Sequence, residues 1–293
     1  MSHFKFLGTG VAIITPFRED SSIDFKSLDK LVENIIAKGV EYIVVLGTTG
    51  ENVTLSKDEK KAIVNYVIDV ADKRVPIVVG VGGNNTHEVI HSIQDYDYSS
   101  IDGILSVAPY YNKPTQNGLF QHFKTIASAS PVPVILYNVP GRTGSNISAD
   151  TTLKLAKECK NVVGIKEASG DFNQIMQIIK NKPKGFHVIS GDDALSLPMI
   201  SIGGSGVISV TANAFPKEFS DMVRFALAGE LNKANELHYK MYDIICSFFT
   251  EGSPSGVKAA LEILGLIKNY VRLPLVPVSE DHYKKIAQLI KKF

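Results

Sequence analysis

The sequence has few cysteines, no long hydrophobic run and almost no net charge, and each of these features excludes a class of protein. Cys159 and Cys246 are its two cysteines, and they are far apart in the sequence, with no CxxC pair. This excludes a disulfide framework and a structural zinc site, and a reducing compartment fits best. No run approaches the roughly 18 consecutive apolar residues of a membrane span, and the segment Met1 to Gly10 lacks the features of a signal peptide. We therefore expect a cytoplasmic protein with no membrane partner.

The charge balance also limits the partners. The chain carries 31 basic and 30 acidic side chains, which leaves a formal net charge of +1 over 293 residues. Proteins that bind nucleic acids or anionic membranes normally carry a basic excess or a basic stripe, so we expect no nucleic-acid partner. The hydrophobic fraction of 44% is ordinary for a globular chain, which can bury a sizeable core at this length.

A short β-branched run, a turn and an amphipathic stretch recur many times along the chain. The runs are nearly continuous in apolar residues, which is typical of parallel strands covered on both faces. They are Val11 to Thr15, Tyr42 to Leu46, Pro76 to Gly80, Gly103 to Val107, Val132 to Asn138, Val162 to Lys166, His187 to Ser190 and Gly206 to Val210.

Helical patterns lie between these runs. Ser27 to Lys38 places its apolar residues on one face, and a second helix is predicted to begin at Ser56, where Glu59 completes a capping box. Eight such units favour an α/β fold of the (β/α)8 TIM-barrel type over an open doubly wound sheet.

The last quarter of the chain contains helical patterns and no further strand run. Helices are predicted over Lys217 to Leu227, Leu231 to Phe248, Val257 to Leu264 and Asp281 to Lys292. We therefore expect a barrel domain with the active site over residues 1–224, and a C-terminal helical domain over 225–293 packed on the barrel.

In such barrels the active site lies at the C-terminal ends of the strands. Polar segments follow four of the predicted strands. They are Gly47 to Glu51, Pro109 to Pro114, Tyr137 to Gly144 and Gly164 to Ala168. We expect these segments to converge.

Lys166 is the strongest single candidate for catalysis, because an apolar strand carries it toward the mouth of the barrel. Desolvation disfavours the ammonium form, and a neutral lysine can attack a carbonyl group to form a Schiff base. The alternative is a structural lysine that extends to solvent or pairs with Glu167.

Three further segments could support such a lysine. Tyr137 lies on the adjacent predicted strand at a similar depth and could transfer protons. Thr48 and Thr49 offer hydroxyl and N–H groups in a glycine-flanked turn, and Arg142 offers a fork for a carboxylate. Each has a structural alternative: a buried tyrosine with a hydrogen-bond partner, an ordinary helix-entry turn and a solvated loop arginine.

Two motifs favour other functions but lie in unsuitable places. His87 to His91 matches the HExxH motif of zinc hydrolases, yet it falls in the first turns of a helix with no obvious third ligand. The glycines of Gly203 to Gly206 precede a strand, on the face opposite the expected site, which favours a tight turn over a phosphate cradle. We expect no metal.

The chain resembles the dihydrodipicolinate synthase family, nearly end to end. The most specific motifs are Gly47 to Glu51, Tyr110 to Pro114, Tyr137 to Gly144, Gly164 to Ala168, Ser190 to Asp193 and Gly206 to Asn213. The resemblance implies a lyase that condenses pyruvate with L-aspartate-4-semialdehyde, the committing step of diaminopimelate and lysine biosynthesis. It implies no cofactor, because the lysine itself supplies the electron sink.

The resemblance also implies a role for each site residue. Lys166 forms the Schiff base with pyruvate, Tyr137 is the general acid and base, and Thr48 links Tyr137 to Tyr111 of a neighbouring subunit in a homotetramer. The residues that hold the substrates are Thr49 and the main chain at Ile208 for pyruvate, Arg142 for the carboxylate of the semialdehyde, and Gly191.

Other functions remain open from the residues alone. N-acetylneuraminate lyases share the lysine and tyrosine, but Arg142 favours the synthase. A catalytically silent barrel that binds a small carboxylic acid is a second alternative, and a zinc hydrolase using His87 and His91 is a third.

The sequence departs from the family in two places. Asn84, Glu88 and Tyr110 match the effector pocket of lysine-inhibited members, but Lys57 and Lys60 replace two histidines of that pocket. Because two cations repel the ammonium group of lysine, we expect weak or absent feedback by lysine. The segment 251–256 also departs, which leaves the contacts of the C-terminal helices open.

Overall fold

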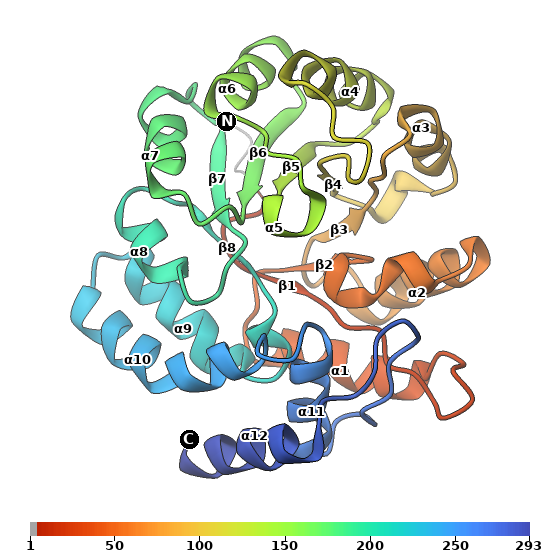
Figure 1. Cartoon of the computed structure of the whole chain (residues 1–293), viewed down its shortest axis with the longest axis vertical. Coiled ribbons are helices and arrows are strands. Elements are labelled where there is room, and N and C mark those ends of the chain that lie inside the picture. Colours follow the sequence, from red (N-terminus) through yellow and green to blue (C-terminus); the bar gives the residue numbers. More distant parts are fainter. Residues whose placement is uncertain (1–4) are drawn as a thin grey trace.

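The computed structural model describes residues 5–293, so residues 1–4, where the expected barrel domain and the N-terminal segment begin, lie outside the described part. Eight parallel strands pair in sequence order, and β1 also pairs with β8 to close the barrel (Figure 1). The strands are β1 Gly8–Ala12, β2 Tyr42–Val45, β3 Ile77–Gly80, β4 Gly103–Val107, β5 Val134–Asn138, β6 Val162–Glu167, β7 His187–Ser190 and β8 Gly206–Ser209. The predicted (β/α)8 barrel is confirmed.

Helices surround the strands, and the last three helices lie together along one side of the barrel, in blue in Figure 1. The helices are α1 Phe25–Ala37, α2 Lys57–Ala71, α3 Thr86–Gln94, α4 Gln116–Ala129, α5 Pro140–Thr143, α6 Ala149–Glu158, α7 Phe172–Asn181, α8 Ser196–Ser201, α9 Pro216–Leu227, α10 Leu231–Ser247, α11 Ser255–Ile263 and α12 Glu280–Lys292. Four short 3-10 turns complete the elements: η1 Thr48–Gly50, η2 Asn52–Thr54, η3 Tyr98–Ser100 and η4 Thr211–Asn213.

The strands are apolar on both faces because they separate two layers of core. Side chains such as Val44, Leu105 and Ile135 form a cluster inside the barrel, whereas Ile43 and Val45 belong to the larger cluster that includes the helices. This double burial explains why the strand runs are nearly continuous rather than alternating.

The first strand lies earlier than predicted, at Gly8–Ala12 instead of Val11 to Thr15. The sequence pattern missed it because two glycines, Gly8 and Gly10, dilute its apolar character. Gly10 is required by packing: a Cβ at this position would lie 2.2 Å from the ring of Tyr42, which crosses the strand there. The sequence therefore predicted the presence of a first strand correctly but placed its bounds three residues too late.

The helix signals read from the sequence are confirmed. In α2, Ser56 accepts a hydrogen bond from the N–H of Glu59, and the Glu59 side chain accepts one from the N–H of Ser56, which is the predicted capping box. The four C-terminal helices lie close to their predicted bounds.

The division of the chain into residues 1–224 and 225–293 remains a proposal, and its boundary falls within α9. In segment 251–256, α11 begins at Ser255, whose hydroxyl donates to the carbonyl of Val276 at 2.8 Å. Among the residues that the structure describes, no helix is long and apolar enough to cross a membrane.

Candidate active site

Two adjoining pockets lie at the C-terminal ends of the strands, and both are lined by Thr48, Tyr137, Val139 and Arg142. The first, here called the Lys166 pocket, is also lined by Thr49, Lys166, Ala168, Gly191, Asp192, Val210, Phe249 and Ser253. The second, the Tyr110 pocket, is also lined by Asn52, Val53, Thr143 and Tyr110, with residues from the ends of β2, β3 and β4. The polar segments expected to converge do so here.

Lys166 and Tyr137 are direct neighbours across the sheet. They are register partners on β6 and β5, and their exposed fractions are only 5% and 6%. The Lys166 Nζ lies 4.4 Å from the centroid of the Tyr137 ring, a distance at which an ammonium group is attracted to the ring face. The amine and the phenol therefore share one confined space inside the barrel mouth.

Gly191, at the end of β7, makes room for the lysine. A Cβ at position 191 would lie 2.8 Å from Cβ of Ala168 and 2.9 Å from Cε of Lys166. The N–H of Gly191 donates to the carbonyl of Glu167 at 2.8 Å, which fixes the loop beside the lysine.

A polar cluster on the other face of the sheet supports the same two strands. Asn138 and Glu167 follow Tyr137 and Lys166 directly, and both are buried. The Asn138 amide donates to both Glu167 carboxylate oxygens at 3.1 and 3.2 Å, and Gln174 donates at 3.0 Å. Burial raises the pKa of Glu167, although these hydrogen bonds oppose the rise. Because side chains alternate across a strand, pinning Asn138 and Glu167 outside holds Tyr137 and Lys166 inside.

The turn that carries the two threonines is tightly constrained. Thr48 and Thr49 begin η1. Leu46, two residues before it, and Glu51, directly after it, have positive φ values of 59° and 54°. The Thr15 hydroxyl donates to the carbonyl of Gly50 at 2.7 Å. Thr49 is buried and Thr48 exposed, and both residues line the Lys166 pocket.

Arg142 lies in α5, at the rim where the two pockets meet. Within residues 5–293 no acidic side chain pairs with it, so its guanidinium group can accept an external carboxylate.

Some predicted site residues lie outside the Lys166 pocket. Ile208 is buried on β8 in the interior cluster, and Val210 two residues later lines the pocket instead. Tyr111 is 89% exposed, has a positive φ of 72° and lines neither of the two pockets.

The predicted effector residues are only partly brought together. The Asn84 amide donates to the carbonyl of Tyr110 at 3.2 Å, whereas Glu88 is exposed on α3. Lys57 and Lys60 line a separate pocket with Lys61, Asp95 and Tyr96, which shares Asn52 and the end of β3 with the Tyr110 pocket.

Sequence reasoning missed Phe249 and Ser253, which line the Lys166 pocket from the C-terminal part of the chain. No local pattern marks them, because they follow a helix and not a barrel strand. It also missed the role of Asp193. This buried carboxylate accepts hydrogen bonds from the N–H groups of Val210 and Thr211 at 3.1 and 2.7 Å. These bonds connect the turn after β7 to the end of β8.

His87 and His91 are exposed on α3, as the helical position of the HExxH motif predicted. Over residues 5–293 there is no group of three or more His, Cys, Asp or Glu side chains that could hold a metal ion.

Comparison with known proteins places this arrangement in a family. Residues 5–293 match the Dihydrodipicolinate synthetase family. The chain belongs to this family. It is 55% identical to the 4-hydroxy-tetrahydrodipicolinate synthase of Flavobacterium psychrophilum, over 98% of both chains.

Solved structures of this dihydrodipicolinate synthase fold agree closely with the chain. The chloride-inhibited enzyme of Acinetobacter baumannii, complexed with pyruvate, is 43% identical with a TM-score of 0.95, and 98% of each chain is covered. A monomeric dihydrodipicolinate synthase variant is 39% identical with a TM-score of 0.96, over 98% of this chain and 97% of the other.

The predicted family, fold and reaction are thereby confirmed. The chain is a lyase that carries out the dihydrodipicolinate synthase reaction of lysine and diaminopimelate biosynthesis. The N-acetylneuraminate lyase alternative finds no support among these relatives.

Proposed function

We propose that Lys166 forms a Schiff base with pyruvate and that the enamine derived from it condenses with L-aspartate-4-semialdehyde. The observation that carries this assignment is the placement of Lys166, Tyr137, Thr48, Thr49 and Arg142 around one pocket. The complex of a 43% identical relative with pyruvate supports pyruvate as a ligand.

The chemistry requires an amine and a proton-transfer group side by side. The Lys166 amine adds to the pyruvate ketone, and loss of water gives the Schiff base. Loss of a proton from the pyruvate methyl group gives an enamine, whose carbon attacks the aldehyde carbon of the semialdehyde. The amino group of the bound semialdehyde then displaces Lys166 and closes the ring. Tyr137 donates and accepts these protons. The centre of its ring lies 4.4 Å from the Lys166 nitrogen.

The remaining pocket residues bind the two carboxylates. Thr49 and Gly191, which line the Lys166 pocket, hold pyruvate together with the main chain near Ile208, whose side chain belongs to the interior cluster. Arg142 stands at the rim and receives the carboxylate of the semialdehyde with its planar fork, which a lysine could not match.

We further propose that the chain assembles into a homotetramer in the cytoplasm. Tyr111 then reaches a neighbouring subunit and extends the proton relay from Tyr137 through Thr48. Tyr111 is exposed and follows the exposed Tyr110 of the Tyr110 pocket in the sequence, which supports a surface that a second subunit covers. Light scattering and a Tyr111→Phe variant test this: a fully active monomer would remove the intersubunit role.

Borohydride trapping tests the covalent step directly. Reduction in the presence of pyruvate should leave a pyruvyl-derived group on the Lys166 peptide by mass spectrometry, and Lys166→Arg is the matched control that keeps the charge. An unmodified Lys166 under turnover conditions would reject the proposal.

A comparison of aldehydes tests Arg142. Arg142→Ala should raise KM for the semialdehyde far more than KM for pyruvate, because the removed group contacts only the former. Equal effects on both substrates, or preferred use of a sugar aldehyde by the unaltered protein, would contradict the assigned role.

A further inference from the structure

We propose that two cationic residues of the C-terminal region, Lys258 and Arg272, are positioning residues for the reaction: through Glu51 they hold the turn that carries Thr48 and Thr49. This inference rests on the roles proposed above for the two threonines. It gives the C-terminal region a part in the chemistry of the barrel.

The central contact is an ion pair between Lys258 and Glu51 with no solvent access to either side chain. Lys258 lies on α11, and its Nζ donates to Glu51 Oε1 at 2.5 Å and to the carbonyl of Tyr270 at 2.8 Å. The second carboxylate oxygen of Glu51 accepts the N–H of Arg272 at 3.0 Å. Both oxygens of this buried carboxylate are therefore bound by residues more than 200 positions later in the chain.

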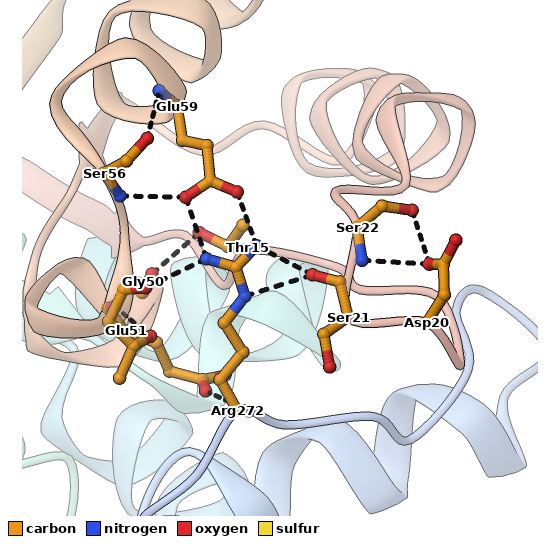
Figure 2. Close-up of polar contacts among 10 residues, drawn as sticks. Thr15, Asp20, Ser21, Ser22, Gly50, Glu51, Ser56, Glu59 and Arg272 are labelled. Carbon is orange, nitrogen blue, oxygen red and sulfur yellow. Dashed lines mark hydrogen bonds and ion pairs between the residues drawn. The ribbon is translucent and has the colours of Figure 1, made fainter.

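The guanidinium group of Arg272 uses all five of its N–H donors on the same region of the barrel, as Figure 2 shows in part. It binds both carboxylate oxygens of Glu59, the carbonyl of Thr54 and, through two donors, the carbonyl of Ser21. Thr54 and Glu59 follow the threonine turn directly, so Arg272 fixes the chain just after it.

An aromatic ring completes this contact between the barrel and the C-terminal region. Phe17 lies in the loop after β1, with Lys258 Nζ 4.3 Å and Arg272 Cζ 4.5 Å from its ring centroid. The two cations thus contact the segments after β1 and β2 at once.

The link from Glu51 to the threonines is short. The N–H of Glu51 donates to the carbonyl of Thr48 at 3.1 Å. Glu51 also has a positive φ of 54°, a backbone conformation that a residue other than glycine adopts only when its surroundings enforce it. Holding the Glu51 carboxylate therefore holds the end of η1. Glu51 does not line the Lys166 pocket or the Tyr110 pocket, so it acts through the threonines.

A purely structural role is the competing explanation, and energetics disfavours it. A buried ion pair contributes little net stability, because removing two charges from water costs about as much as their attraction returns. A well-packed apolar pair would serve stability equally well, whereas a charged pair with three directed hydrogen bonds fixes one position of the turn.

The test uses the full-length enzyme with the neutral double variant Glu51→Gln plus Lys258→Met, which leaves no buried charge unpaired. We expect kcat to fall about 10- to 100-fold, as displacement of catalytic groups by roughly 1 Å does. KM for pyruvate should rise, while KM for the semialdehyde should change little, because Arg142 lies on α5 and not on the threonine turn. Hydrogen exchange of the amides over residues 46–54 should become faster.

Ile286→Ala, at a fully buried position on α12, is the matched control. It should destabilise the C-terminal region while leaving kcat, both KM values and exchange over residues 46–54 unchanged. Adding Thr48→Val to the neutral variant should reduce kcat less than Thr48→Val does alone, because both changes act on one turn. If the neutral variant does not fold, Arg272→Gln, at a partly exposed side chain, should show the same changes to a smaller extent.

Four outcomes separate the possibilities. The positioning role would be overturned if the neutral variant had the same kcat and KM values as Ile286→Ala. It would also be overturned if the fold-losses in kcat of the neutral variant and of Thr48→Val simply multiplied in the combined variant. Faster exchange over residues 46–54 with unchanged kcat would also overturn it. A wild-type kcat for Thr48→Val alone would instead reject the proposed relay, which is a separate failure.

Discussion

Gly191 lies directly against the side chain of Lys166: a Cβ at position 191 would be 2.9 Å from Cε and 3.1 Å from Cγ of the lysine. Such separations are too short for carbon atoms, so one group must move. A Cβ would also lie 2.8 Å from Cβ of Ala168, which cannot rotate away, so an added methyl group displaces the flexible lysine and also strains the backbone at these positions. The Lys166 amine therefore owes its position to the absence of a side chain at residue 191.

The first prediction follows from this contact. Gly191→Ala should lower kcat by about 10- to 100-fold, since a displacement of roughly 1 Å in a reacting group has effects of this size. Borohydride trapping at Lys166 should fall in parallel. Gly141→Ala is the matched control, because a Cβ there meets nothing within 4 Å. Normal trapping in Gly191→Ala would show that Lys166 tolerates the added methyl group.

Much of the barrel and its central pair could be predicted from the sequence because both depend on local pattern. Apolar runs followed by polar turns locate the strands, and consecutive parallel strands place Tyr137 beside Lys166. The register of β1 could not be predicted, because it depends on Gly10 lying against the ring of Tyr42 from the neighbouring strand.

Contacts between distant segments were beyond local pattern as well. The bond between Lys258 and Glu51 joins residues 207 positions apart, and neither residue type favours burial on its own. Phe249 and Ser253 reach the Lys166 pocket only because the C-terminal helices pack against the barrel mouth. Their positions depend on the assembled fold, so no sequence motif predicted them.

The second prediction concerns the polar cluster behind the active site. Glu167 accepts hydrogen bonds from Asn138, Gln174 and the N–H of Ser169, so its carboxylate faces only donors. Glu167→Gln places an amide NH₂ among those donors and should reduce the free energy of unfolding by about 1–3 kcal/mol, the cost of an unsatisfied buried polar group. Urea denaturation measures this.

Glu236→Gln on the exposed face of α10 provides the comparison for that experiment, with an expected change close to zero. Unaltered stability of Glu167→Gln would mean that the cluster rearranges to accept an amide. In that case the cluster would not hold the ends of β5 and β6 rigidly.

The third prediction is a loss of stability in mild acid. Burial lowers the pKa of His122 to about 4, and burial with the nearby Lys182 lowers the pKa of His187 to about 4. Because histidine in the unfolded chain titrates near pH 6.5, the unfolded state binds more protons between pH 6.5 and 4. The free energy of unfolding should therefore fall as the pH falls through this window.

His122→Gln should flatten that dependence, by at most about 1.4 kcal/mol per pH unit for one proton. His91→Gln, at an exposed position on α3, should leave the slope as it is in the unaltered chain. Denaturant titrations at several pH values between 4.5 and 6.5 avoid the range below pH 4.5. In that range the unfolded chain takes up a proton on Glu59, whereas in the folded protein the ion pair with Arg272 holds the pKa of that carboxyl at about 2. If the pH dependence of the free energy of unfolding were unchanged in His122→Gln, groups other than His122 would cause the loss of stability in acid.

The fourth prediction is that L-lysine at micromolar concentration does not inhibit the enzyme. Lys57 and Lys60 line one pocket, and the pKa of Lys60 is lowered by burial and by the charge of Lys57. A third ammonium group at about 4 Å from either would meet a repulsion of roughly 1–4 kcal/mol per pair. Steady-state assays with added L-lysine measure this.

Replacing both cations tests whether they are the cause. The double variant Lys57→His plus Lys60→His removes most of the positive charge at neutral pH, since histidine is largely uncharged above its pKa near 6.5. It should become more sensitive to L-lysine, and more so at pH 8 than at pH 6, because protonated histidines restore the repulsion. Lys30→His, at an exposed position on α1, should have no such effect. Inhibition of the unaltered enzyme by micromolar lysine would show that the two cations do not exclude the effector.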